Sequence, residues 1–226
     1  MKRSEINRIQ EEAKRFLAEH RFPLPPWATR RPSDWRGLGP EIDEIRENML
    51  GWDVTDFGSL DFKRRGLFLF TLRNGNPQRD KKPYAEKIMI VEVMQETPMH
   101  FHRRKMEDII NRGGGRLVIE VHASTRDENL SAETVELSVD GVRLKVAAGT
   151  RISLEPGESV CLEPFIYHRF WAEGAKTLVG EVSMANDDVG DNRFLEDIGR
   201  FPEIEEDEEP LHLLVSDYGR RLGKPR

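Results

Sequence analysis

Histidine and glutamate side chains in the middle of the chain have the types and spacing of metal ligands. His100 and His102 stand two positions apart, and Glu107 follows after four intervening residues. On a strand the two imidazoles point to the same face, about 6.5 to 7 Å apart along the chain. His168 lies 61 residues after Glu107, in a second run with strand character, residues 167–171. Two strands would therefore bring three imidazoles and one carboxylate together.

This ligand set suits a borderline divalent cation. Manganese, iron, cobalt, nickel and zinc fit it better than magnesium or calcium, which prefer oxygen ligands only. Four protein ligands on an octahedral ion leave two positions for water or substrate. The set therefore predicts a catalytic metal site. The alternative is a solvated strand face, which is the usual place of an isolated His-x-His pair.

The spacing of His100, His102, Glu107 and Gly114, with His168 further along, resembles the metal motif of the cupin family. This resemblance implies a jelly-roll β-barrel that binds one metal ion through the three histidines and the glutamate. Cupins usually have glycine six residues before the first histidine, where this chain has Met94. Such differences concern the local turns more than the ligands.

Longer stretches of the chain resemble the D-lyxose isomerases, a family within the cupins. The resemblance extends over most of residues 87–202 and implies one divalent metal ion per chain, commonly manganese. It also implies the interconversion of D-lyxose with D-xylulose, and of D-mannose with D-fructose. The matching segments are residues 97–102, 105–115, 180–183, 186–188, 191–194 and 199–202.

An aldose–ketose isomerisation moves one proton between C1 and C2, so it needs a general base. Glu181 stands in an otherwise apolar or small run, residues 177–183, and burial there would raise its pKa. The alternation of residue types along this run does not decide whether Glu181 faces the interior or the surface. Lys105 stands two positions before Glu107, so on a strand both side chains point to the same face and Lys105 would point toward the metal. Together with the resemblance, these arguments predict Glu181 and Lys105 as catalytic, although Lys105 also reads as a surface lysine.

Three further residues are predicted to bind the substrate. Asp191 and Arg193 lie in a loop rich in Asn and Asp, residues 186–193, and loops over barrel mouths often carry specificity. The alternative for this pair is a helix cap and a surface ion pair. Lys87 begins the strand that leads into the metal motif and would also reach the pocket.

The ligands alone leave three functions open. The leading hypothesis is a metal-dependent sugar isomerase that works through a cis-enediol. A cupin dioxygenase is the chief rival, because three histidines and one glutamate also hold the Fe(II) that activates oxygen. The third is a sugar-sensing cupin without catalysis. The polar loop 186–193 favours a polyhydroxylated ligand, but one fold hosts many functions.

The composition is that of a soluble globular protein. Of 226 residues, 37% are hydrophobic and 34% charged, and the formal net charge is −6. An acidic chain makes nucleic-acid binding unlikely, and no apolar run is long enough for a membrane span. The N-terminus leads into charged residues, and Cys161 is the single cysteine. These features predict a cytoplasmic protein with no nucleic-acid or membrane partner.

Apolar periodicity and turn residues predict a single mainly β domain. Residues 1–50 would form a helical extension packed on the barrel, with helices at 4–20, capped by Ser4, and at 41–48. Residues 51–226 would form the barrel and a C-terminal segment with a short helix at 215–222. Residues 113–115 would form a tight turn, and the exposed barrel face suggests a homodimer. The expected strands are 53–57, 66–72, 87–94, 116–123, 134–137, 142–146, 151–154, 159–162, 167–171 and 177–183.

Overall fold

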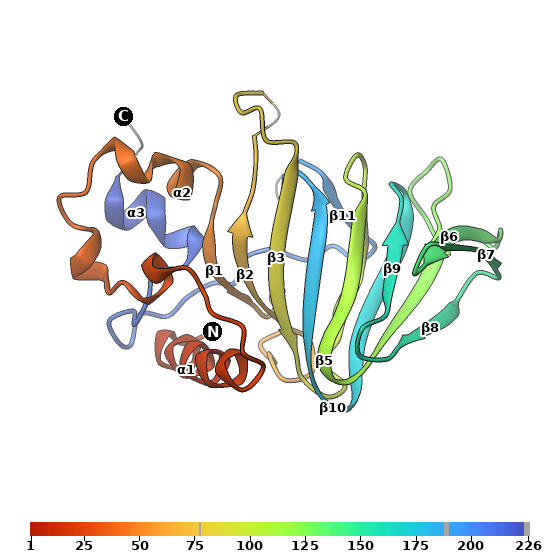
Figure 1. Ribbon diagram of the computed structural model, residues 1–226, viewed down its shortest axis with the longest axis horizontal. Helices are drawn as coiled ribbons and strands as arrows, with labels where there is room; N and C mark the ends of the chain where they lie inside the picture. The colour runs from red at the N-terminus through yellow and green to blue at the C-terminus, as the bar shows by residue number, and fades with distance from the viewer. Residues whose placement is uncertain (77, 188–189, 224–226) are drawn as a thin grey trace.

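The chain folds mainly as antiparallel β structure, with its helices gathered at one end (Figure 1). The computed structural model describes residues 1–76, 78–187 and 190–223. Asp188, part of a segment that resembles the isomerases, lies outside the described residues. None of the helices in the described part has the length and apolar character that a membrane crossing needs. The helical segments are α1 Arg3–Glu19, η1 Pro26–Thr29, η2 Pro32–Trp35, η3 Pro40–Ile42, α2 Asp43–Glu47, η4 Val215–Asp217 and α3 Tyr218–Leu222.

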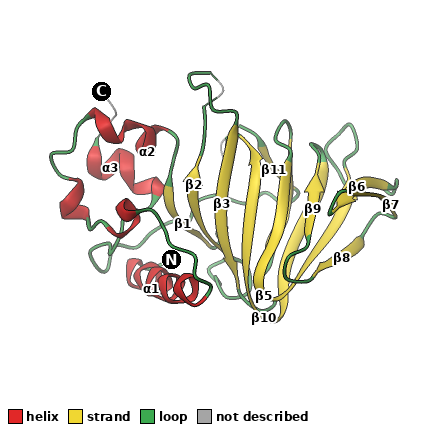
Figure 2. Ribbon diagram, viewed as in Figure 1, coloured by secondary structure: helices red, strands yellow, loops and turns green. Residues whose placement is uncertain are grey.

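The described strands form one antiparallel sheet, which agrees with the predicted jelly-roll class (Figure 2). Its main path runs β1-β2-β3-β10-β5-β9-β6-β7, while β4 pairs with β10 and β11, and β8 pairs with β5. The strands are β1 Gly51–Thr55, β2 Leu67–Arg73, β3 Tyr84–Val91, β4 Thr97–His102, β5 Glu107–Ala123, β6 Val135–Val139, β7 Val142–Val146, β8 Thr150–Leu154, β9 Ser159–Leu162, β10 Ile166–Met184 and β11 Asn192–Phe194.

The expected turn at residues 113–115 is wrong, because these glycines lie inside the long strand β5. A Cβ at Gly114 would lie 2.1 Å from the carbonyl oxygen of Lys176. The φ of Gly114 is +100°, a value that favours glycine. The glycines therefore let β5 bend and approach β10 where the register of the two strands shifts. The expected strands 167–171 and 177–183 are likewise parts of the single strand β10.

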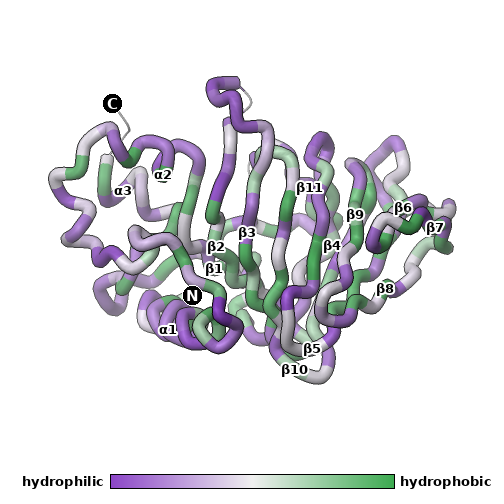
Figure 3. The backbone as a smooth tube through the Cα atoms, in the orientation of Figure 1, coloured by the Kyte–Doolittle hydropathy of each residue, from purple (hydrophilic) through white to green (hydrophobic). Residues whose placement is uncertain are grey.

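The β2 and β3 strands are buried on both faces. Phe68 and Phe70 pack in a cluster with the apolar face of α1, whereas Leu67 and Leu69 pack in the barrel core. This explains why β2 is apolar at successive positions rather than at alternate ones. Figure 3 shows hydrophobic residues along the middle of the strands and hydrophilic ones at the loop tips. Helix α1 thus covers one face of the sheet, while the other face is left to line the barrel. The domain boundary at residue 50 stays a prediction.

The start of α1 is held by the acidic segment 203–209, and Ser4 is not its cap. The N-cap is Lys2, and the Ser4 hydroxyl donates to Asp207 at 2.7 Å. Arg3 is fully buried and donates twice to Asp217, at 2.8 and 3.0 Å. It also donates twice to Glu206, at 2.9 Å each. The two ends of the chain are therefore joined by one buried guanidinium.

We expect Arg3→Met to lower the free energy of unfolding by about 3 to 5 kcal/mol, because it removes the buried guanidinium and leaves the buried Asp217 carboxylate to the more exposed Arg220. Arg8→Met is the control, since Arg8 pairs with Glu12 on the exposed face of α1 and should change stability by less than about 0.5 kcal/mol. Urea unfolding at pH 7 measures both. A loss below about 1 kcal/mol for Arg3→Met would place its ion pairs among ordinary surface contacts.

The same contact predicts a pH dependence. Hydrogen bonds from Arg3 and, to a smaller extent, from Arg220, opposed by burial, hold the pKa of Glu206 at about 2, below its usual 4.5. Unfolded Glu206 thus takes up a proton at a higher pH than folded Glu206. This contribution is present above about pH 4.5 and is lost as the pH falls toward 2. The stability difference between wild type and Arg3→Met should therefore shrink below about pH 4.5.

Candidate active site

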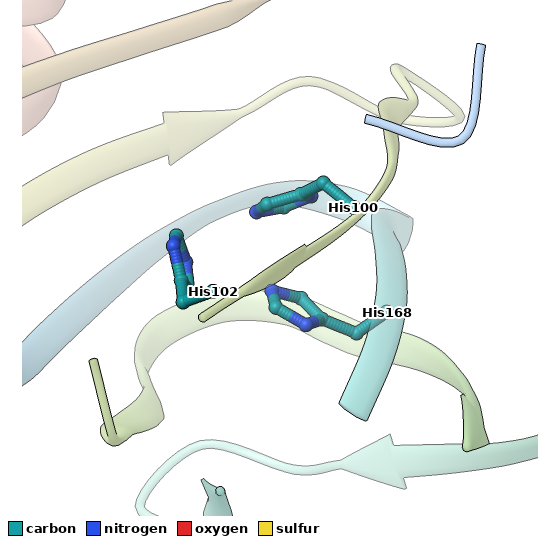
Figure 4. A group of neighbouring side chains, drawn as sticks. All are labelled: His100, His102 and His168. Carbon is teal, nitrogen blue, oxygen red and sulfur yellow. The ribbon is translucent and has the colours of Figure 1, made fainter. Parts of the chain in front are cut away.

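The predicted metal ligands lie on three strands whose side chains meet inside the barrel. His100 and His102 are on β4, Glu107 begins β5, and His168 is on β10. His168 is directly opposite His100 in the pairing of β10 with β4. Figure 4 shows the three imidazole rings around a common space. Strand alternation and cross-strand pairing thus gather residues that are far apart in the sequence.

The three imidazoles are close enough to share one ion. Each offers a ring nitrogen, and these nitrogens lie within 4.8 Å of one another. The ring centroids of His100 and His168 are 4.2 Å apart, and those of His100 and His102 are 5.3 Å apart. All three side chains are buried. Such a group of imidazoles suits a borderline divalent cation.

Backbone carbonyls fix the tautomer of two of these histidines. The Nδ1 of His100 lies 2.8 Å from the oxygen of Pro98, and the Nδ1 of His168 lies 3.0 Å from the oxygen of Ile166. A carbonyl can only accept, so each Nδ1 carries the proton and donates it. The Nε2 of both rings is left with a lone pair, as a metal ligand requires.

The contacts of Glu107 fit a cation in this space. Its Oε1 lies 3.1 Å from Nε2 of His168 and 3.3 Å from Nε2 of His102. Within the described chain, Glu107 Oε1 and His168 Nε2 are buried atoms without a hydrogen-bond partner. Both are acceptors when the imidazole is neutral, so their close approach is unfavourable unless a positive charge lies nearby. A divalent ion held by His100, His102, Glu107 and His168 would supply that charge.

Burial keeps His100 and His102 neutral. Desolvation comes first in lowering the pKa of His100 well below its usual value, and the neighbouring histidines lower it further. Desolvation and the charge of Lys105 lower the pKa of His102. Neutral imidazoles are the form that binds metals. The site is therefore ready to bind a cation at neutral pH.

A chain of alternating charges links the predicted metal ligand Glu107 to Glu181. Lys105 Nζ lies 2.7 Å from Glu107 Oε2 and 2.8 Å from Glu181 Oε1. Lys87 is directly opposite Glu181 in the pairing of β3 with β10, and its Nζ lies 3.2 Å from Glu181 Oε1. These four side chains are all buried. The predicted catalytic pair and Lys87 thus share one cavity with the predicted metal ligands.

The lysines keep both carboxylates ionised. Burial alone would raise the pKa of Glu107, but Lys105 and His102 hold it well below its usual value. Burial would likewise raise the pKa of Glu181, but Lys105 and Lys87 hold it below that value. Burial would lower the pKa of Lys105, but the two glutamates raise it. Glu181 is thus a carboxylate, able to accept a proton, although burial was expected to raise its pKa.

Asp191 and Arg193 do not line this cavity. The Asp191 carboxylate accepts the backbone N–H of Arg104 at 2.8 Å and that of Lys105 at 3.1 Å. Arg193 Nε donates to Glu128 at 3.0 Å, and Arg193 also contacts the carbonyl of Phe194. Asp191 therefore shapes the turn that carries Lys105, and Arg193 is held away from the metal ligands. Their predicted role in binding substrate stays a prediction.

The cavity has further lining residues that the sequence did not single out. Its volume is about 50 Å³, which holds an ion and a few waters. All four of the polar residues beyond those predicted lie in segments that resemble the isomerases, but no pattern indicates which side chains there turn inward. The polar residues beyond those predicted are Thr97, Asn186, Asn192 and Arg200, and the apolar ones include Leu67, Leu69, Met89, Phe170 and Phe194.

Known proteins resemble the whole chain. A family model described as D-lyxose isomerase matches residues 1–218. A D-lyxose/D-mannose isomerase of Serratia proteamaculans is 50% identical over 225 residues, which cover 97% of this chain and 99% of that protein. A D-lyxose/D-mannose isomerase of Escherichia coli O157:H7 is 47% identical over 223 residues, covering 96% and 98%.

The fold also has relatives among solved structures. A mutant L-ribose isomerase of Acinetobacter sp. DL28, in complex with L-ribose, superposes with a TM-score of 0.60 at 15% identity. The alignment covers 91% of this chain and 98% of that one. At this identity the likeness concerns the fold, and it confirms the mainly β, cupin-type architecture.

Proposed function

We infer the reaction from one premise: the chain belongs to the D-lyxose isomerase family and is a sugar isomerase. We propose that it interconverts D-lyxose with D-xylulose, and D-mannose with D-fructose. The two relatives named above carry both aldoses in their names. D-Lyxose and D-mannose have the same configuration at C2, so one base in one place serves both. The observation that carries the proposal is the carboxylate of Glu181, which is buried beside the histidine group and paired with Lys105 and Lys87.

The proposed cofactor is one divalent ion per chain, most simply Mn²⁺, held by His100, His102, Glu107 and His168. Zinc, iron, cobalt and nickel suit the same ligands. When bound, such an ion polarises the carbonyl and neighbouring hydroxyl oxygens of the open-chain sugar. The acceptor atoms of Glu107 and His168 that face each other support this choice.

Glu181 is the proposed base. Its Oε1 accepts hydrogen bonds from Lys105 at 2.8 Å and from the Ser183 hydroxyl at 3.0 Å. Its Oε2 has Lys87 Nζ at the longer distance of 3.5 Å, so Oε2 is the oxygen better placed to accept a proton. In our proposal Oε2 takes the proton from C2 of the aldose and returns it to C1, through a cis-enediol, while the hydroxyl proton on O2 passes to O1.

The lysines are proposed to act as fixed positive charges. Lys105 bridges Glu107 and Glu181, so its ammonium lies between the metal ligands and the base. There it can donate a hydrogen bond to an oxygen that gains negative charge as the C2 proton leaves. Lys87 donates to Asn186 Oδ1 at 2.8 Å and to Glu181, which fixes the base from its other side.

The test is to incubate manganese-loaded protein with D-lyxose and to measure D-xylulose. We expect D-xylulose to form without oxygen consumption, and we expect D-mannose to give D-fructose. Oxygen uptake would favour the dioxygenase, and sugar binding without turnover would favour the sensor; the family of the chain supports neither. The homodimer and the cytoplasmic location stay predictions.

A further inference from the structure

One guanidinium lines the cavity without a part in the chemistry proposed above. Arg200 follows β11 in the chain and lines the same cavity as His100 and Glu181. Its side chain is 10% exposed. A charged group so well buried needs partners, and Asp53 is one of them. Because its guanidinium also lines the cavity, Arg200 is a candidate for binding the part of the substrate that does not react.

The guanidinium and its backbone are held by two residues that are not among those lining the cavity. One of its terminal nitrogens donates to Asp53 Oδ2 at 2.6 Å, and Asp53 is 3% exposed. The Thr55 hydroxyl donates to the backbone oxygen of Arg200 at 2.8 Å. Asp53 and Thr55 are both on β1, two residues apart and so on one face. A planar guanidinium fixed by a carboxylate keeps further N–H donors in a defined orientation.

Asp53, which holds the Arg200 guanidinium, lies away from Glu181, where the sugar is proposed to react. In the sheet, Asp53 is opposite Leu69, Leu69 is opposite Met89, and Met89 is opposite Val179. Asp53 is thus three strands from β10, about 14 Å along the sheet. Leu69 and Met89 line the cavity between them. The Arg200 side chain covers part of this separation, because it lines the cavity together with Leu69 and Met89. A sugar with its reacting carbons at Glu181 and its tail along this apolar wall would therefore approach the guanidinium.

We propose that Arg200 binds the terminal hydroxyl of the open-chain sugar and that Asp53 is its positioning residue. The inference rests on the proposed function, since it assumes an aldose with its C1 and C2 at Glu181. The guanidinium N–H groups donate to the hydroxyl oxygen, which is an acceptor. Asp53 holds the guanidinium before the sugar arrives, so less freedom is lost on binding. Arg200 thereby sets how well pentoses and hexoses are accepted, because their terminal hydroxyls differ in distance from C2.

The test compares D-lyxose with 5-deoxy-D-lyxose, which lacks only the terminal hydroxyl. We expect wild type to prefer D-lyxose by roughly 10- to 100-fold in kcat/KM, the usual effect of a hydrogen bond to a charged group. In Arg200→Met the preference should fall to within about twofold, with unchanged metal content. The two sugars differ in ring closure, but that difference affects both enzymes equally. An Arg200→Met enzyme that keeps the wild-type preference would overturn the proposal.

Two further variants separate this role from a structural one. Arg200→Met leaves the buried Asp53 carboxylate without its guanidinium, which can destabilise the fold. The double variant Asp53→Asn with Arg200→Gln removes both charges and should show the same lost preference. Arg116→Met is the control, because Arg116 pairs with Glu173 on the exposed surface and is absent from the lining of the cavity. It should keep the wild-type preference.

The result also separates this inference from the choice of substrate. If wild type converts D-mannose but not D-lyxose, the proposed D-lyxose reaction is contradicted. The comparison is then made with D-mannose and 6-deoxy-D-mannose, which again differ only in the terminal hydroxyl. A preference lost in Arg200→Met supports the role of Arg200, and a preference kept overturns it.

Discussion

His168→Ala should lose metal and activity together. The substitution leaves two imidazoles and one carboxylate, which hold a labile ion poorly. We expect metal affinity to fall by more than about 100-fold, since even residues that only orient ligands contribute 10- to 100-fold. The same result is expected for alanine at His100 or His102. Metal analysis after dialysis, with isomerisation rates on the same samples, measures both quantities.

His122→Ala is the matched control for these variants. His122 is on β5, and its Nε2 lies 3.5 Å from Glu120 rather than near the other histidines. It should keep both metal and turnover. Circular dichroism should show folded protein in all four variants. Full metal content with normal turnover in any one of the three ligand variants would remove that residue from the proposed site.

The metal ligands were the easiest part of the site to predict. His100 and His102 share one strand, so alternation places them on one face, whereas Glu107 begins the next strand and the cupin-like spacing was needed to group it with them. The distant His168 has no such local signal, and the resemblance to cupins supplied it. The structure brings all four together, because β10 pairs with both β4 and β5.

The orientation of Glu181 could not be predicted from alternation. Leu178 packs in the cluster with α1, and Val179 packs in the barrel core, so both faces of β10 are apolar at this point. Val182 is exposed where α1 no longer covers the sheet. The sequence of β10 alone does not tell which face is covered by a helix from the other end of the chain.

Side chains in loops were harder still, because distant residues decide where they point. Asp191 and Arg193 lie in the polar loop that the sequence singled out, yet Arg193 is held by Glu128, from the loop after β5. Arg200 lies in a segment that resembles the isomerases, and its partner Asp53 is 147 residues earlier. Neither of these two ion pairs leaves a periodic pattern in the sequence. Propensity and spacing therefore predict the strands better than the contacts at the mouth of the barrel.

The largest effect on turnover alone is expected for Glu181→Gln. Glutamine keeps the shape and the hydrogen bond from Lys105 but cannot accept a proton from carbon at neutral pH. We expect kcat to fall by about 100- to 10,000-fold, the usual contribution of a general base. KM and metal content should change little, since the metal ligands are untouched. Steady-state kinetics on metal-loaded enzyme measures the split between kcat and KM.

Reaction in heavy water identifies the route of the proton. If Glu181 relays it through an enediol, wild type should place solvent deuterium on C1 of D-xylulose, because a protonated carboxyl group exchanges with water before it returns the proton. A hydride shift would carry the original hydrogen across without exchange. NMR of the product measures the label. A base that returns its proton faster than it exchanges would also leave no label, so the label is read together with the variants.

Lys105→Met completes the argument, because Lys105 is the nearest other group that could carry the proton. It lies 2.8 Å from Glu181 Oε1, and its removal takes a positive charge from the site. If Glu181 is the base, Lys105→Met should turn over slowly but still incorporate deuterium, because the carboxylate remains. A Glu181→Gln enzyme with normal kcat would remove Glu181 from its role and leave the isomerase assignment intact. Active Glu181→Gln together with inactive Lys105→Met would make Lys105 the proton carrier instead.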